Sequence, residues 1–205
     1  MRVLSLLDTV RSDVLRDSVS PFLFSQESLL LYANEGYQQL ARRTHYFRDR
    51  TSLAVEAGKA VYDLPVNTIF IHQVWLGNWR LEHLTRQHQP APVAGKPRAY
   101  STDVPTNKLI LYPTPDTADS LSIHRVYKPD ELTLGGTIDM PSEWAVPLQD
   151  WIAYRALRNN DPDGSDTIAA DKFWESWEVH VRDVKRAVMA EDAGAMASAQ
   201  PVRWI

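Results

Sequence analysis

The chain has 205 residues, of which 44% are hydrophobic and 23% are charged. This is ordinary globular usage and disfavours disordered, collagen-like and coiled-coil classes. The absence of cysteine excludes disulfides, thiolate metal sites and cysteine nucleophiles. A formal net charge of −4 gives no global excess of positive charge for binding nucleic acid. No run approaches the roughly 20 apolar residues of a membrane span, so we expect a soluble protein of cytosolic type with no membrane contact.

Apolar residues at helical spacing predict two helices before residue 50. In the first helix they recur three or four positions apart: Val3, Leu6, Leu7, Val10 and Val14. Pro21 cannot continue a helix and closes the stretch that stops this one. The second helix is expected to begin after Ser25, a preferred N-cap residue, and to keep one face apolar to about Thr44.

Between residues 51 and 140, short β-rich runs alternate with Gly, Pro and Asn, which is typical of strands joined by turns. Gly77-Asn78 is a tight-turn signal within this region. Strands are predicted near residues 53–55, 60–63, 70–76, 80–83, 108–112 and 121–127. We therefore expect a β-rich insert that forms a small sandwich or barrel.

Two more helices are predicted after Pro141, and the second has a continuous apolar seam: Ala170, Trp174, Trp177, Val181, Val184 and Val188. Such a seam must face something apolar, most simply the N-terminal helices. The predicted fold class is therefore α+β. Residues 1–50 and 141–190 form a four-helix bundle, residues 51–140 form the β-rich insert, and residues 191–205 form an extended C-terminal tail.

No constellation of residues indicates an enzyme. None of the six histidines stands in a zinc-protease motif, and no serine-nucleophile elbow is present. Asp161, Asp163 and Asp166 lack the spacing of a calcium loop, because Gly164 and Lys172 fall at the wrong positions. We expect no catalytic residue, no metal and no cofactor.

The β-rich insert contains four candidate contact residues. Trp75 and Trp79 flank the predicted turn, where at least one should be partly exposed, either packing on the sheet or contacting a partner. Arg80 and Arg98 belong to the stretch 66–98, whose local charge is +3. This mildly basic face either meets an acidic partner or is a solvated edge. A glycan or a protein is the alternative ligand of the tryptophan-bearing insert.

The last residues of the sequence are the other candidate contact. Trp204 and Ile205 are bulky and apolar, and burying each is worth roughly 1.5–3 kcal/mol. The run of small residues before them is long enough to act as a reach. They either dock on the chain's own core or insert into another subunit or a partner protein, and in the second case Val202 and Arg203 belong to the same contact.

The whole chain resembles the head-to-tail adaptor (connector) proteins of tailed bacteriophages, and in particular those of podovirus-like necks. Characteristic pieces are Tyr62-Asp63-Leu64-Pro65 and the run Leu109-Ile110-Leu111-Tyr112-Pro113. The resemblance covers about residues 1–190, and its pieces lie at residues 3–7, 10–13, 24–35, 62–65, 95–100, 109–115 and 148–157. No family catalytic residue exists to be carried over.

This resemblance implies a structural subunit of the virion neck that is made in the host cytoplasm. It implies a homo-oligomeric ring, usually of twelve copies, below the portal protein, which extends the DNA channel and docks tail or nozzle proteins. The genomic DNA passes through the lumen without specific binding, and an acidic lumen would repel its phosphates. Family members often grip the portal with the C-terminal tail, which suits Val202, Arg203, Trp204 and Ile205.

Overall fold

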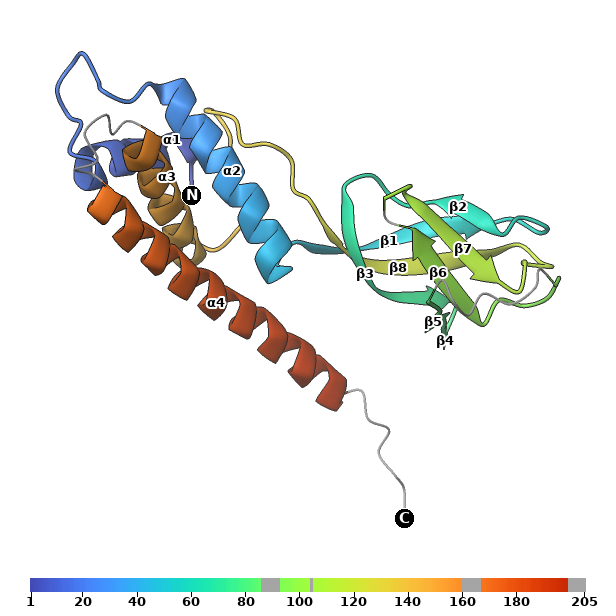
Figure 1. Cartoon of the computed structure of the whole chain (residues 1–205). Coiled ribbons are helices and arrows are strands. Elements are labelled where there is room, and N and C mark those ends of the chain that lie inside the picture. The colour runs from blue at the N-terminus through green and yellow to red at the C-terminus, as the bar shows by residue number, and fades with distance from the viewer. Residues whose placement is uncertain (86–92, 104, 160–166, 199–205) are drawn as a thin grey trace. The chain divides into compact units, whose positions relative to one another are not determined.

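The computed structural model describes residues 1–85, 93–103, 105–159 and 167–198. The chain divides into two compact units, a helical unit of Met1–Tyr46 with Pro129–Ile205 and a β unit of Phe47–Lys128 (Figure 1). Helices build the first unit and two small sheets build the second, so the predicted α+β class is confirmed. The more specific arrangement as a four-helix bundle stays a prediction.

The helical unit begins with α1 (Val3–Thr9), which continues into a π-helical turn, η1 (Val10–Val14). Helix α2 (Gln26–Thr44) follows, with Ser25 as its N-cap, and the Ser25 hydroxyl accepts a hydrogen bond from the Ser28 N–H at 3.1 Å. This is the predicted cap. His45, in the left-handed conformation, ends the helix.

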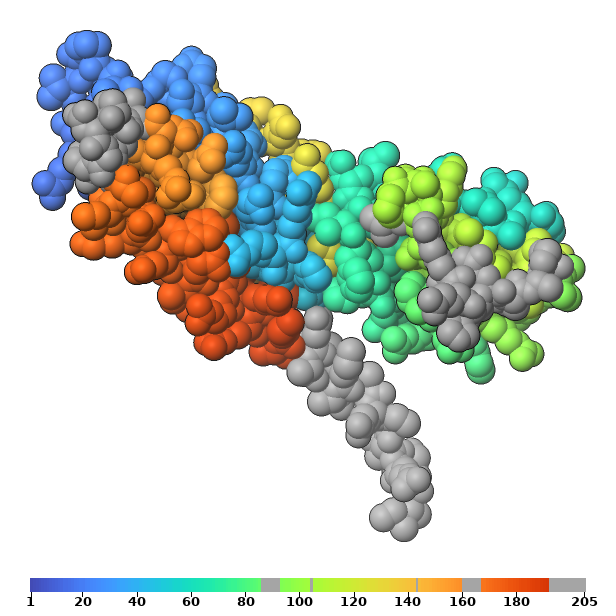
Figure 2. Space-filling model, viewed as in Figure 1, coloured from blue at the N-terminus to red at the C-terminus, as the bar shows by residue number. Residues whose placement is uncertain are grey.

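The second half of the unit contains the 3₁₀ turn η3 (Ser142–Ala145), α3 (Val146–Asn159) and α4 (Thr167–Ser198). Pro147 lies in the first turn of α3, where its missing N–H costs no helical hydrogen bond. The predicted seam of α4 is buried at Ala170, Trp177, Val181, Val184 and Val188, whereas Trp174 is 37% exposed. Figure 2 shows the α4 surface running beside that of α3 within this unit.

Helices α2 and α3 pack closely against each other at Gly36. A Cβ atom on Gly36 would lie 2.7 Å from Cδ1 and 2.9 Å from Cγ of Trp151, closer than carbon atoms can pack. Two ion pairs hold α2 to its neighbours: Arg155 of α3 lies 2.9 Å from Glu35, and Arg43 donates two hydrogen bonds of 2.6 Å to Glu178 of α4. The bond from Arg43 lowers the pKa of Glu178.

The β unit is a sandwich of two four-stranded sheets, ordered β1–β8–β3–β4 and β2–β7–β6–β5. The strands of the first sheet are β1 (Arg48–Val55), β8 (Asp119–Tyr127), β3 (Thr68–Leu76) and β4 (Trp79–Arg80). Those of the second are β2 (Val61–Asp63), β7 (Lys108–Tyr112), β6 (Ala99–Asp103) and β5 (Glu82–His83). All pairs are antiparallel except β5 with β6.

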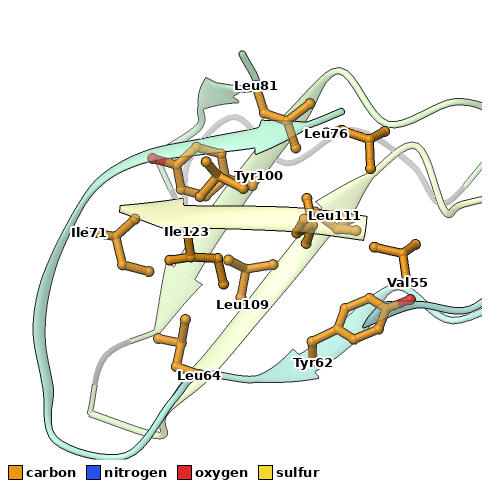
Figure 3. Close-up of a cluster of buried hydrophobic side chains, with 12 residues drawn as sticks. Val55, Tyr62, Leu64, Ile71, Leu76, Leu81, Tyr100, Leu109, Leu111 and Ile123 are labelled. Carbon is orange, nitrogen blue, oxygen red and sulfur yellow. The ribbon is translucent and has the colours of Figure 1, made fainter. Parts of the chain in front are cut away.

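The core of the sandwich lies between the two sheets. Leu109 and Leu111 of β7 and Leu121 and Ile123 of β8 belong to one core cluster, and all four are fully buried. Figure 3 shows Leu109, Leu111 and Ile123 among the buried side chains of this cluster. Each sheet therefore has one apolar inner face, because alternate residues of a strand point to opposite faces. Within the described residues the sheets stay separate, so the structure is a sandwich and not a closed barrel.

One strand prediction was wrong, and one strand of the structure was not predicted. The predicted strand at 80–83 is two short strands, β4 and β5, because Leu81 turns into the core (3% exposed) while the chain passes from one sheet to the other. Strand β6 was not predicted, since its sequence from Ala99 to Asp103 lacks an apolar alternation. This segment is a strand because its backbone pairs with β7, although its own side chains do not show a strand pattern.

The close approach at Gly36 predicts that Gly36→Ala destabilises the protein. The added methyl group displaces the Trp151 ring, and overpacking of this kind costs about 1–3 kcal/mol, which outweighs a gain of up to about 1 kcal/mol in helix propensity. Urea unfolding should show a lower free energy of unfolding. Gly135→Ala is the matched control in the same unit, because a Cβ there meets no atom within 4 Å. A Gly36→Ala protein as stable as its parent would contradict the prediction.

Candidate interaction surfaces

The predicted turn between Trp75 and Trp79 is a tight hairpin that joins β3 to β4. Gly77 supplies the positive φ of 55° that the turn needs. Trp75 pairs with Arg80 across the hairpin and Leu76 pairs with Trp79. Cross-strand partners point to the same face of a sheet, so Trp75 and Arg80 share the outer face. Trp79 lies on the opposite, inner face, together with its partner Leu76. The structure therefore separates the two tryptophans.

Trp79 is 65% exposed at the edge of the sheet, and Trp75 is half-buried. The Trp75 indole N–H donates to the Gln73 side-chain oxygen at 3.1 Å, which fixes the ring on the outer face. Arg98 directly precedes β6 and is held beside the second sheet: its N–H donates to the Tyr112 carbonyl, and its carbonyl accepts from the Glu82 N–H. Of the four predicted contact residues, the register therefore brings only Trp75 and Arg80 to one face.

The sheet register adds residues that sequence reasoning missed. Ser122 is the cross-strand neighbour of Trp75, and His124 is the neighbour of both Gln73 and Arg50. Arg50 donates from Nε to the Ser122 hydroxyl at 2.6 Å. The outer face of the first sheet thus carries a patch that we call the cationic sheet face: Arg50, Gln73, Trp75, Arg80, Ser122 and His124.

Two guanidinium groups give this face its charge. In the part of the chain that the structure describes, neither Arg50 nor Arg80 forms an ion pair with a carboxylate, and both are exposed. Burial, and to a lesser extent the charge of Arg50, lowers the pKa of His124 below its ordinary value of 6.5. His124 is therefore neutral at pH 7, and the positive charge of the face comes from the arginines.

The neighbouring Asp49 and Arg125 are structural. Arg125 donates from Nε and Nη2 to the two carboxylate oxygens of Asp49, each at 2.8 Å, and from Nη1 to the Val66 carbonyl. The hydrogen bonds from Arg125 lower the pKa of Asp49. These contacts tie β1, β8 and the residues before β3 together and leave Arg125 only 11% exposed. Arg125 is thus occupied within the unit and adds little to the cationic sheet face.

The helical unit presents an apolar loop that the sequence analysis did not single out. Val19, Phe22 and Leu23 are 77%, 49% and 67% exposed. The loop is nevertheless fixed, because the Asp17 carboxylate accepts hydrogen bonds from the N–H groups of Leu23 and Phe24 at 2.9 and 3.0 Å. The only sequence signal was a run of three apolar residues between Pro21 and the Ser25 cap: Phe22, Leu23 and Phe24.

A serine, a histidine and an aspartate meet between α3 and α4. The Asp150 carboxylate lies 2.7 Å from His180 Nδ1 and accepts a hydrogen bond from the Ser176 hydroxyl at 2.9 Å. In a catalytic triad the serine and the aspartate bind opposite nitrogens of the ring. Here both lie on the Nδ1 side, and Ser176 donates to the carboxylate instead. The cluster joins two helices and lacks the geometry of a nucleophile.

Other site types were searched for as well. Across the described ranges there is no group of three or more His, Cys, Asp or Glu side chains placed to hold a metal ion. No helix in the same part of the chain is long and apolar enough to span a membrane. Val202, Arg203, Trp204 and Ile205 lie outside the described residues, so their predicted role in binding a partner stays a prediction.

The fold and its surfaces define a two-unit α+β protein with two candidate contact surfaces, a cationic sheet face and a fixed apolar loop. Comparison with family models matches residues 1–202 to the model described as SU10 adaptor protein. The chain belongs to this adaptor family, and the resemblance to phage head-to-tail adaptors is confirmed. A search of curated proteins finds no match. The family implies a structural component of the virion and a role without catalysis.

The lowered pKa of His124 predicts a pH effect on stability. In the unfolded chain this histidine takes up a proton near pH 6.5, but in the folded protein it does so only at lower pH. The free energy of unfolding therefore falls as the pH drops below about 6.5, until the folded pKa is passed. His124→Gln removes this contribution.

Urea unfolding of both proteins between about pH 7.5 and about pH 5 tests this effect. The difference in free energy of unfolding between parent and variant at the upper pH, where residue 124 is neutral in both proteins, is the reference value. The parent should lose more free energy of unfolding than the variant on acidification. Parallel pH profiles would contradict the prediction.

Proposed function

We propose that the protein is a ring-forming structural subunit of a tailed-phage neck, which sits below the portal, extends the DNA channel and docks tail components. The observation that carries this proposal is the adaptor-family match over residues 1–202, nearly the whole chain. Twelve copies is the expected ring size, from the resemblance to head-to-tail adaptors. The portal, tail or nozzle proteins and further copies of the chain are the proposed partners, and genomic DNA passes through the lumen.

The surfaces of the two units support a ring. A closed ring needs two different faces on every subunit, each complementary to the other, so that every copy contacts two neighbours in the same way. This chain offers chemically different surfaces on its two units: exposed Val19 and Leu23 on one, and Arg50 and Arg80 on the other. Weak contacts become secure in a ring, because each further contact is effectively intramolecular.

Native mass spectrometry and electron microscopy of the purified protein, alone and mixed with its portal, test the proposal. We expect closed rings, either free or on the portal, with one adaptor ring per portal ring. A protein that stays strictly monomeric and ignores the portal would overturn it. A glycan array then tests the alternative ligand, with Trp79→Ala as the variant that removes the exposed ring.

The C-terminal residues provide a separate prediction. Deleting residues 202–205 should weaken attachment to the portal and leave the fold intact, because Trp204 and Ile205 each supply roughly 1.5–3 kcal/mol when buried in a partner. Co-sedimentation with portal measures the attachment, and circular dichroism measures the fold. Exchanging Ser198 with Gln200 is a control that keeps the apolar residues. Undiminished attachment of the deleted protein would refute this role of the tail.

A further inference from the structure

The charge of the chain is divided unevenly between its two units. The β unit, residues 47–128, has ten Lys and Arg against seven Asp and Glu, a net charge of +3. The helical unit has twelve Lys and Arg against nineteen Asp and Glu, a net charge of −7. The formal charge of −4 thus hides two units of opposite sign. Units of opposite sign on different copies attract each other.

The positive side of this division has a defined surface. On the cationic sheet face, Ser122 fixes Arg50 and Gln73 fixes Trp75, while Arg80 is the cross-strand neighbour of Trp75. The face combines two exposed guanidinium groups with a half-buried indole ring. Arg and Trp are enriched where proteins bind each other, whereas Lys is depleted. This chemistry fits a protein surface that carries carboxylates.

The helical unit carries such carboxylates on the segment 129–140, which we call the acidic strap. From residue 129 to residue 154 the sequence contains no Lys or Arg. Asn34 of α2 holds the strap in place: its amide donates to the Leu132 carbonyl at 3.1 Å and its oxygen accepts from the Leu132 N–H at 2.6 Å. Asp130 and Glu131, directly before this anchor, are exposed and make no ion pair within the described residues.

We propose that the cationic sheet face of one subunit binds the acidic strap on the helical unit of a second copy, as the repeating contact of the ring. This inference rests on the proposed function and names the surfaces through which it is carried out. The contact is heterologous, since it joins two different faces, and such contacts close into rings or extend into filaments. Every copy brings one cationic face and one strap, so the charges match copy by copy.

DNA is the other polyanion that two arginines attract. Sequence-independent binding of DNA relies on many phosphate contacts, typically six to ten. Within the described ranges, the cationic sheet face offers two cations without an ion-pair partner, Arg50 and Arg80. Arg125 is bound to Asp49 and His124 is neutral at pH 7, so neither adds a further free cation. The acidic strap presents a matching small number of carboxylates. The observations therefore favour a second copy of this chain over DNA.

Charge reversal of each side tests the contact. The first variant is Arg50→Glu with Arg80→Glu, and the second is Asp130→Lys with Glu131→Lys. A matched control, Lys59→Glu with Lys96→Glu, makes the same change in net charge as the first variant at exposed positions away from the cationic sheet face. Circular dichroism and urea unfolding confirm that each protein is folded. Assembly is measured by native mass spectrometry and sedimentation, with portal present where the parent needs it.

We expect each charge-reversed variant alone to assemble at least about tenfold more weakly than the parent, since like charges then face each other. An equal mixture of the two should restore rings in which the variants alternate, because every contact again joins opposite charges. The control should assemble like the parent. Raised salt should weaken ring assembly of the parent and of the mixture to the same extent, because salt screens exposed charges.

Two results overturn the inference alone: parent-like rings from the Arg50→Glu, Arg80→Glu protein, or a mixture of two folded variants that does not assemble. Unchanged rings together with loss of binding to a DNA duplex would assign the cationic sheet face to DNA instead. A parent protein that forms no ring, with or without portal, overturns the proposed function and this inference with it. The parent's own behaviour thus separates the two failures.

Discussion

The pairing of β1 with β8 is the constraint on which the rest of the structure depends. The register is unbroken from Arg48 opposite Val126 to Val55 opposite Asp119. Just before it, the Tyr127 N–H donates to the Phe47 carbonyl at 3.0 Å. Because these strands are antiparallel neighbours, the chain enters and leaves the β unit side by side. The helical unit can therefore be assembled from two segments far apart in sequence, without the entropy cost of closing a long flexible loop.

Helix α2 connects the other segments of the helical unit. Its side chains reach three different segments: Asn34 binds the acidic strap, Glu35 pairs with Arg155 of α3, and Arg43 pairs with Glu178 of α4. Gly36 lets α3 approach to contact distance at Trp151. The ion pairs are partly exposed and add little free energy each, so their main contribution is to fix register while burial supplies the stability. The acidic strap owes its position to the contact with Asn34.

The helices could be predicted because their signals are local. The Ser25 cap and the seam of α4 act within a few residues, and the structure confirms both. Most strands of the β unit were predicted for the same reason. The division of residues 80–83 between two sheets could not be, since it depends on Leu81 finding a core built from distant strands. Strand β6 is likewise specified by its partner.

The candidate site likewise depends on contacts between distant strands, which local sequence patterns do not predict. Trp75 and Arg80 were predicted as candidate contacts from the sequence, but their common face with Arg50 comes from the register of four strands, through Ser122 and His124. No short-range pattern links residues 50, 80 and 124. Trp79 and Trp75 are near in sequence but lie on opposite faces, because the hairpin sets side-chain direction by alternation. The apolar loop at Val19 was missed because exposure cannot be inferred from apolar residue type alone.

Helix α4 has a mechanical consequence. It spans 32 residues, about 48 Å at 1.5 Å per residue, and its seam anchors it from Ala170 to Val188. A force along the helix axis would stretch the backbone hydrogen bonds, which run parallel to that axis. The same force would shear the packed seam, so many contacts would have to break together. The helix would act as a stiff strut that passes on a displacement instead of absorbing it.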